Sequence, residues 1–354
     1  MLQQTRSGTS DIVRTSREDR GVSRAVVRWT GAMLLAATAV VIISAQPRPL
    51  ALVSTPWSPF TNEPGRPRFA LDLVEAALGR FGVTAKTTIV SPAEFTPALL
   101  SEQFDGTASA WKNPERERLL IFSQPYLQNR LVIVGQLGAD VSAKQLTDLK
   151  GRRLAIVGGY AYGDAVETAG AVIVLSDSEE DSLTRLLKGD VDYALMDELV
   201  VEHIQRDYPE QASKRLQVGT TPLVTRDLHF AIRRTVPDAA SIVSRFNAQL
   251  RAMIADRTYH RLLHVDWIRA DIDGDGRPEY VPSSDQAGPS APKHSYSLFW
   301  TEQAKSRPIP EPTGFYLGGN VYTDWARVPD RYKASFSTDP DPRRSTGTIF
   351  RFTW

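Results

Sequence analysis

Arg116 is the residue whose type and setting suggest the most specific chemistry. It ends the segment Asn113-Pro114-Glu115-Arg116 and stands six residues before the run Phe122-Ser123-Gln124-Pro125-Tyr126. A guanidinium presents paired N–H donors in one plane, which fit the two oxygens of a carboxylate and fix its orientation as well as its charge. A Glu-Arg pair in a loop is by default only a solvated pair, so Arg116 can be taken as a carboxylate clamp only with support from other residues.

A second chemical signal is an Asp/Gly-rich loop near the C-terminal end of the chain. Its carboxylates occupy the first, third, fifth and ninth positions: Asp271, Asp273, Asp275 and Glu279. Oxygen ligands at this spacing can wrap around Ca²⁺, and Gly276 permits the sharp turn. Pro282 stands where an EF-hand has its twelfth-position Glu, so the loop resembles the short calcium loops of repeat and dockerin-type extracellular proteins. We expect a weak structural Ca²⁺ site, and the alternative is a turn that binds no metal.

Composition narrows the class of protein. The 354 residues are 42% hydrophobic and 23% charged, which suits about two domains with a buried core. The formal net charge of +1 and the lack of a sustained basic stripe argue against nucleic acid as a partner. The chain has no cysteine, which excludes disulfides, thiolate catalysis and Cys-based zinc sites.

Residues 1–45 are typical of an export signal. A basic and polar run precedes the apolar stretch 29–45, which ends in Ile43-Ser44-Ala45, where a signal peptidase could cut. We expect cleavage before Gln46, and the alternative is an uncleaved membrane anchor with the same orientation. In either case the remaining chain lies outside the cytoplasm, so we predict a periplasmic protein.

The elements that must position these residues follow a repeated strand–helix order, which predicts a parallel sheet with helices on its faces. The chain crosses to a second unit after strand 131–134 and offers a return crossing near 219–222. We therefore predict an α/β fold of two hinged lobes with a ligand cleft between them. The predicted strands are 50–53, 87–90, 131–134, 154–157, 172–175, 193–196, 216–218 and 228–232, and the predicted helices are 70–81, 97–103, 163–169, 179–187, 198–206 and 237–257.

Four segments, in order along the chain, carry a family resemblance. They are Pro56-Trp57-Ser58-Pro59-Phe60, Arg68-Phe69-Ala70-Leu71-Asp72-Leu73, Asn113-Pro114-Glu115-Arg116 and Lys188-Gly189-Asp190-Val191-Asp192-Tyr193-Ala194-Leu195-Met196-Asp197-Glu198. Over about Arg48 to Trp267 the chain resembles the family 3 periplasmic solute-binding proteins, which deliver polar amino acids to ABC importers. This resemblance implies the type II periplasmic-binding fold. The chain departs from the family pattern at Arg68, where glycine is usual, and at Asn113, where threonine is usual.

The resemblance implies roles for two charged residues on opposite lobes. The position matched by Arg116 holds the α-carboxylate of a bound amino acid, and the position matched by Asp197 receives the α-ammonium group. A zwitterion held at both ends would favour the closed state of the lobes. Asp is also a preferred helix N-cap, and at Asp197 the two roles can coexist.

The resemblance also implies an aromatic box made of Trp57, Trp111 and Tyr160. Such a box suits an aromatic or extended side chain, by stacking or by cation–π attraction. The alternative is that one or more of these rings belongs to the core.

The remaining expected ligand contacts are small residues. Ser109 falls where the family lines the pocket, and Ala161 lies with Tyr160 in the loop 159–163, whose backbone N–H groups help to hold the carboxylate. Ser54 stands where relatives that bind basic amino acids tend to have Asp, which argues against lysine or arginine as the ligand.

The C-terminal part reads as an extension without helical periodicity. We predict a linker at 286–292, a small hairpin at 315–322 with Gly-Gly-Asn at its turn, and an edge strand at 348–354. The resulting division of the chain is 1–45 signal peptide or anchor; 46–270 two-lobed domain, with lobe 1 at about 48–136 and 222–268 and lobe 2 at about 137–221; 271–282 calcium-type loop; and 283–354 Pro/aromatic-rich extension.

The predicted function is an exported, monomeric binding protein that captures a polar or aromatic amino acid for an inner-membrane ABC permease. It requires no cofactor, and Ca²⁺ would be structural. An alternative is an enzyme that resembles the periplasmic prephenate or arogenate dehydratases, which need a general acid; Glu102 and Glu115 are the candidates near the expected pocket. A further alternative is a ligand-sensing module.

Overall fold

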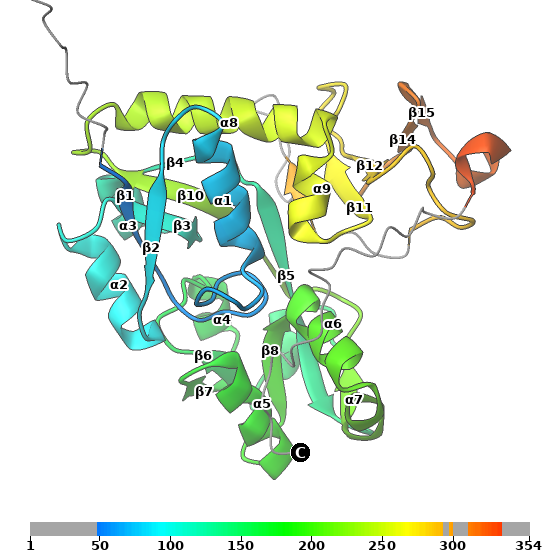
Figure 1. The fold of residues 1–354 in the computed structure, drawn as a ribbon. Helices are drawn as coiled ribbons and strands as arrows, with labels where there is room; N and C mark the ends of the chain where they lie inside the picture. Colours follow the sequence, from blue (N-terminus) through cyan, green and yellow to red (C-terminus); the bar gives the residue numbers. More distant parts are fainter. Residues whose placement is uncertain (1–47, 293–296, 300–310, 335–354) are drawn as a thin grey trace, which may run out of the picture. The chain divides into compact units, whose positions relative to one another are not determined.

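The computed structural model describes residues 48–292, 297–299 and 311–334, and Figure 1 shows their arrangement. The predicted export signal and the predicted strand at 348–354 lie outside the described residues. In the part of the chain that is described, no helix combines the length and apolarity needed to cross a bilayer.

The first lobe contains parallel strands covered by helices. Helix α1 forms because apolar residues such as Leu73, Val74 and Ala77 recur on one face, and all three are buried. Helices α1, α8 and α9 pack against one another, and α8 crosses α1 (Figure 1). The strands of this lobe are β1 (Leu50–Ser54), β2 (Ala85–Ile89), β3 (Gly106–Ala110) and β4 (Leu120–Phe122), and its helices are α1 (Phe69–Gly79), α2 (Pro92–Leu100), α3 (Pro114–Leu119), α8 (Ala239–Ala255) and α9 (Thr258–Leu263).

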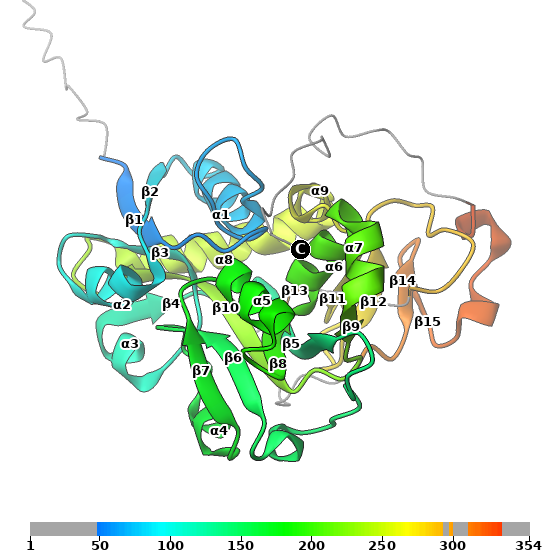
Figure 2. The same cartoon turned by 90° about the horizontal axis from the view of Figure 1, so that it is seen from below.

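The second lobe repeats the strand–helix alternation. Strand β6 pairs in parallel with β7 on one side and β8 on the other, and β7 lies at the outer edge of these strands (Figure 2). Its strands are β6 (Arg153–Val157), β7 (Val172–Ser176), β8 (Tyr193–Asp197) and β9 (Leu216–Val218), and its helices are the 3₁₀ turn η1 (Leu146–Leu149), α4 (Asp164–Thr168), α5 (Glu179–Lys188), α6 (Glu198–Asp207) and α7 (Pro209–Arg215).

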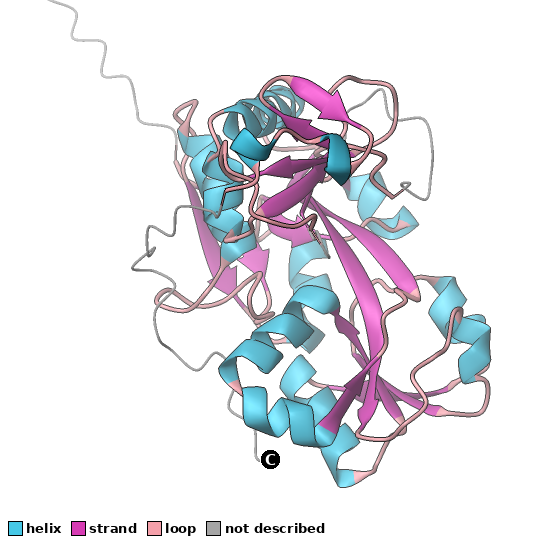
Figure 3. Cartoon of the chain, turned by 90° about the vertical axis from the view of Figure 1, so that its right-hand side faces the viewer, coloured by secondary structure: helices cyan, strands magenta, loops and turns pink. Residues whose placement is uncertain are grey.

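Two long strands, β5 (Leu127–Gln136) and β10 (Val224–Arg233), run between the lobes (Figure 3). They pair antiparallel with each other over 127–131 and 224–228. Beyond that shared stretch, β5 pairs with β8 and β9, whereas β10 pairs with β3 and β4. The two crossings therefore lie within these strands, whereas the sequence placed them after 131–134 and near 219–222. The sheet order is β2-β1-β3-β10-β5-β8-β6-β7.

Some predicted element bounds were wrong for local reasons. Helix α2 begins at Pro92 rather than 97, because Ser91 and Glu94 form a capping box that starts the helix earlier. Helix α7 was not predicted, although Pro209 stands at its first position. The long C-terminal helix ends at Ala255, and α9 follows a left-handed residue, Arg257 (φ 64°).

The C-terminal part forms a sheet of its own, ordered β13-β11-β12-β14-β15. Its small core includes Trp267, Leu317 and Val328. The predicted hairpin is confirmed: its strands pair from Phe315 to Tyr322 around a Gly-Gly turn. The members are β11 (Trp267–Ala270), β12 (Glu279–Pro282), β13 (Ser297–Phe299), β14 (Phe315–Leu317) and β15 (Asn320–Tyr322), followed by the 3₁₀ turns η2 (Trp325–Arg327) and η3 (Asp330–Tyr332).

Candidate ligand-binding site

A single cavity between the lobes gathers most of the residues expected to bind a ligand. Asp197 is the one predicted ligand residue that does not line it. The cavity is lined by six predicted residues, Trp57, Ser109, Trp111, Arg116, Tyr160 and Ala161, together with Thr55, Phe95, Ala110 and Leu228.

Aromatic rings from both lobes pack against one another in this cavity. The Trp57 ring lies 5.5 Å from Trp111 and 5.5 Å from Tyr160, and Trp111 lies 5.5 Å from Tyr162, centroid to centroid. The remaining volume is about 30 Å³, which is room for roughly two water molecules. The three rings thus lie together but pack onto one another, and an amino acid can enter only if these rings or the lobes move apart.

Arg116 is held in place by a short helix whose cap compensates for a departure from the family pattern. Asn113, where threonine is usual, is the N-cap of α3, and its side chain accepts a hydrogen bond from the Arg116 backbone N–H at 2.8 Å. The guanidinium is buried and donates from Nη1 to the Trp111 carbonyl and from Nη2 to Thr96 Oγ1, both at 3.1 Å. Its Nε atom has no hydrogen-bond partner.

The charge of Arg116 is not neutralised by the described part of the protein. No carboxylate of the described residues forms an ion pair with it, although Glu115 contributes a favourable field. Burial lowers the pKa of Arg116 to about 10; the field of Glu115 opposes this shift, and that of the cation Arg226 adds to it. The group therefore stays protonated at neutral pH and offers a buried positive charge to the cavity.

Asp197 lies at the end of β8 and is the N-cap of α6, as the alternative interpretation predicted. Its carboxylate is buried and accepts hydrogen bonds from Leu199 N (2.8 Å), Arg130 N (3.1 Å) and Asn129 Nδ2 (3.1 Å). Burial raises the pKa of Asp197 to about 7 in spite of these donors. Its proposed role toward an ammonium group stays a prediction.

The loops around the cavity have specific backbone requirements. Gly159 adopts φ +79°, and a Cβ there would lie 2.9 Å from the Pro92 carbonyl oxygen, so glycine lets the second lobe approach α2 closely. Ser109 shares a buried hydrogen bond with Ser54, with 3.1 Å between the hydroxyl oxygens. Ser54 therefore supplies a hydroxyl beside the cavity rather than a charge.

Three functional candidates were not identified in the sequence. Thr96 accepts from Arg116 and donates to the Gly159 carbonyl (3.4 Å), which links the lobes. Asn129 is completely buried between Trp111 and Asp197. Glu179, at the start of α5, is buried, and burial raises its pKa to about 8. Only Glu179 had a recognisable signal, namely a position one residue after a Ser N-cap.

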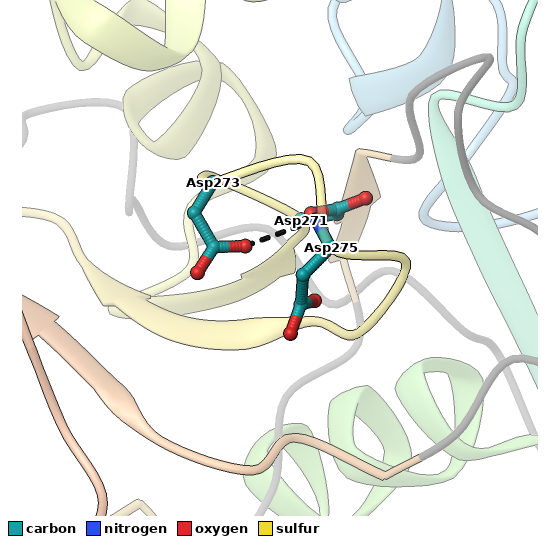
Figure 4. Close-up of side chains that lie close together, drawn as sticks. All are labelled: Asp271, Asp273 and Asp275. Carbon is teal, nitrogen blue, oxygen red and sulfur yellow. Dashed lines mark hydrogen bonds between the residues drawn. The ribbon is translucent and has the colours of Figure 1, made fainter.

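The Asp-rich loop connects β11 to β12, away from the residues of this cavity. Carboxylate oxygens of Asp271, Asp273 and Asp275 lie within 4.8 Å of one another, and Figure 4 shows the Asp275 N–H directed at the Asp273 carboxylate. Glu279 is not a member of this group; its carboxylate accepts the Ile272 N–H at 3.1 Å. The loop thus brings together three of the four predicted metal ligands.

The sequence and the fold can be compared with known proteins. The ABC transporter arginine-binding protein 1 of Escherichia coli (strain K12) is 24% identical over 197 residues, which cover 55% of this chain and 79% of that protein. A probable amino-acid ABC transporter-binding protein of Haemophilus influenzae is 28% identical over 177 residues, which cover 49% of this chain and 65% of that protein.

Solved structures share the fold. An ancestral arginine-binding protein bound to arginine superposes with a TM-score of 0.52 at 24% identity, covering 61% of this chain and 96% of that chain. The GluR0 ligand-binding core from Nostoc punctiforme, in complex with (L)-glutamate, gives 0.51 at 18% identity, covering 60% and 97%. The predicted type II periplasmic-binding fold is confirmed.

The family description matches the chain over residues 52–269, which is more than half of its length. Both named relatives are transporter binding proteins, in line with the predicted binding role, and neither is named as an enzyme. The chain belongs to the bacterial extracellular solute-binding proteins, family 3.

Proposed function

We propose that this protein captures an amino acid by its α-carboxylate on Arg116, in the periplasm, and presents it to an inner-membrane ABC permease. The observation that carries this proposal is a buried guanidinium that faces the interlobe cavity without a carboxylate partner among the described residues. A buried unpaired charge is strongly unfavourable, and a ligand carboxylate would remove the penalty while satisfying the free Nε donor.

Asp197 is the proposed acceptor for the ligand's ammonium group. A carboxylate offers about four acceptor positions, and three of those on Asp197 are used. A bound ammonium would take up the remaining capacity and favour the ionised form. Because Asp197 does not line the closed cavity, this contact requires the aromatic rings to separate as the ligand enters.

The lining favours a polar or aromatic ligand side chain. Trp57, Trp111 and Tyr160 provide surfaces for stacking. Relatives are named for arginine, but a second cation, Arg226, lies over the Trp111 ring at 5.9 Å, and Ser54 supplies no charge. We therefore propose that a neutral polar or aromatic side chain binds better than arginine.

A thermal-shift screen against the standard amino acids, followed by calorimetric titration, tests the function. We expect at least one amino acid to raise the melting temperature, and Arg116→Ala to abolish that shift. Arg118→Ala is the matched control, because Arg118 lies on the same helix but is exposed. The proposal fails if no amino acid binds, or if the Arg116→Ala and wild-type proteins respond alike.

We also propose that the Asp-rich loop binds Ca²⁺ as a structural ion. The proximity of three carboxylates on one hairpin loop supports this role. Added Ca²⁺ should raise the melting temperature of the wild-type protein, and Asp273→Asn should reduce that gain without changing amino-acid affinity. No response to either ion would leave the loop as a turn that binds no metal, and an equal response to Mg²⁺ would show a cation site without preference for Ca²⁺.

A further inference from the structure

We propose that Asn129 is a positioning residue that couples the Trp111 wall of the cleft to the Asp197 carboxylate, so that both ligand-holding sides keep one relative placement. This inference rests on the proposed function of the cleft. Asn129 lies on β5, one of the two strands that join the lobes. It has no exposed surface.

The side-chain amide of Asn129 forms hydrogen bonds with both Trp111 and Asp197. Its Oδ1 accepts the indole N–H of Trp111 at 2.8 Å, and its Nδ2 donates to Asp197 Oδ2 at 3.1 Å. Trp111 in turn accepts a hydrogen bond from Arg116 through its carbonyl at 3.1 Å. A continuous set of hydrogen bonds therefore joins the proposed carboxylate clamp to the proposed ammonium acceptor.

Few side chains could replace Asn129. The site needs one donor and one acceptor on a short planar group, and the amide is the group that supplies both at fixed separation. Aspartate could accept from Trp111 but would face the Asp197 carboxylate with a like charge. Leucine has the same branched shape, although it is larger, and it would leave the indole N–H and Asp197 Oδ2 without their bonds to the amide.

The backbone around Asn129 places it between the lobes rather than within one of them. Its neighbour across the crossing strands is Arg226, whose guanidinium lies over the Trp111 ring and donates to the Lys112 carbonyl at 2.8 Å. Leu131, two residues along β5, pairs with Asp197. Trp111 follows a strand of the first lobe, and Asp197 ends a strand of the second, so Asn129 bonds to both sides from the hinge.

The link can be measured without a ligand through the indole N–H signal of Trp111 in ¹H–¹⁵N spectra, assigned by its loss in Trp111→Phe. In the wild type this signal should shift with pH as Asp197 titrates, with a midpoint near 7. Glu198, Glu179 and Arg130 are the other ionisable groups near Asp197. The titration should therefore vanish in Asp197→Asn and persist in Glu179→Gln.

Substitution of Asn129 should break the link. In Asn129→Leu the indole signal should move and lose its pH dependence, and in Asn129→Asp it should titrate at a shifted pH because two carboxyl groups share the site. A wild-type indole signal that does not respond to Asp197, or one that is unchanged in Asn129→Leu, would overturn the proposal. Asn129→Gln, which keeps both bonding functions, should recover part of the wild-type behaviour if the protein folds.

Binding data separate this inference from the function on which it rests. With the amino acid that gives the largest thermal shift in the screen, affinity should fall by about tenfold to a hundredfold in Asn129→Leu, since buried polar groups lose their partners. If Arg116→Ala loses binding while Asn129→Leu binds like the wild type, the coupling is wrong and the proposed function stands. If the wild type binds no amino acid, the proposed function fails, and the indole titration alone decides whether Asn129 links the two sides.

Discussion

Two buried arginines, Arg116 at the cleft and Arg269 on β11, differ in what the protein gives them. Burial lowers the pKa of each to about 10, and the Nε atom of each lacks a hydrogen-bond partner. Arg269 donates to Gln128 Oε1 at 2.7 Å and lies 3.9 Å from the Glu311 carboxylate. Among the described residues, Arg116 donates only to two neutral oxygens.

This difference separates a structural cation from one that is available to a ligand. A buried cation with protein partners joins parts of the fold, as Arg269 joins the C-terminal sheet to the crossing strand β5. A buried cation without a counter-charge is unfavourable on its own and becomes favourable only when an anion arrives. The burial of an arginine therefore does not by itself indicate a binding site. An arginine that is buried without a counter-charge from the protein does indicate one.

The largest expected effect is on ligand binding in Arg116→Met. Affinity should fall by about a hundredfold or more, because loss of one partner of a buried charge pair costs about 2–5 kcal/mol. Titration calorimetry measures this change. The unliganded variant should lose less stability than Arg269→Met, because removal of an uncompensated charge offsets the loss of the hydrogen bonds to Trp111 and Thr96. An equal or larger loss would show that Arg116 is structural like Arg269.

Arg269→Met should behave in the opposite way. It leaves the buried Gln128 carbonyl without its donor, so the free energy of unfolding should fall by about 2 kcal/mol. Urea denaturation measures the loss, and amino-acid affinity should stay within a few-fold of the wild type. If Arg269→Met instead loses ligand binding while retaining stability, the contrast between the two arginines is wrong.

The stability of the protein should also depend on pH, because two buried acidic groups, Asp197 and Glu179, have raised pKa values. Burial raises the pKa of Asp197 to about 7 and that of Glu179 to about 8, so the folded, unliganded protein holds protons that the unfolded chain releases. Its stability should therefore decrease as pH rises from about 4 through 8.

An ammonium ligand prefers ionised Asp197, so affinity should weaken below pH 7, by at most about tenfold per pH unit. Thermal denaturation at pH 5.5 and pH 8, with and without the amino acid, measures both trends. A ligand-induced stabilisation that is larger at the lower pH would contradict the assigned role of Asp197.

The smallest expected effect belongs to Glu311→Gln. The Glu311 side chain is 71% exposed and contacts both Arg130 (3.0 Å) and Arg269 (3.9 Å). Exposed ion pairs contribute less than about 1 kcal/mol, so this variant should change the melting temperature only slightly, and less at high salt. A loss equal to that of Arg269→Met would mean that Arg269 depends on Glu311 rather than on Gln128.

Local sequence patterns predicted the residues that line the cleft better than the hydrogen bonds that join its two sides. Trp57, Trp111 and Arg116 lie in short motifs beside strands, and the strand ends bring such motifs together. Asn129 and Thr96 have no motif, because their roles depend on which strands become neighbours across the hinge. The collapse of the aromatic rings onto one another likewise depends on how the lobes meet, which no local pattern encodes.

The same limit applies to the C-terminal region. Its hairpin at 315–322 was predictable from its Gly-Gly turn. The sheet was not, because β11 and β12 are only four residues long and pair across the Asp-rich loop. The Asp-rich loop is also the connection of this hairpin, a role that its carboxylate spacing does not indicate.

Strand β11 belongs both to the region that matches the family and to the C-terminal sheet. This has a consequence for any protease that removes the C-terminal residues. The family match ends at residue 269, yet β11 pairs with β12 on one side and β13 on the other. Cleavage after Ala270 would leave a strand with both of its bonding edges bare, and Trp267 without its ring contact to Phe315. Unpaired strand edges recruit other chains, so shortened molecules should associate with each other even though they retain every residue that lines the interlobe cavity.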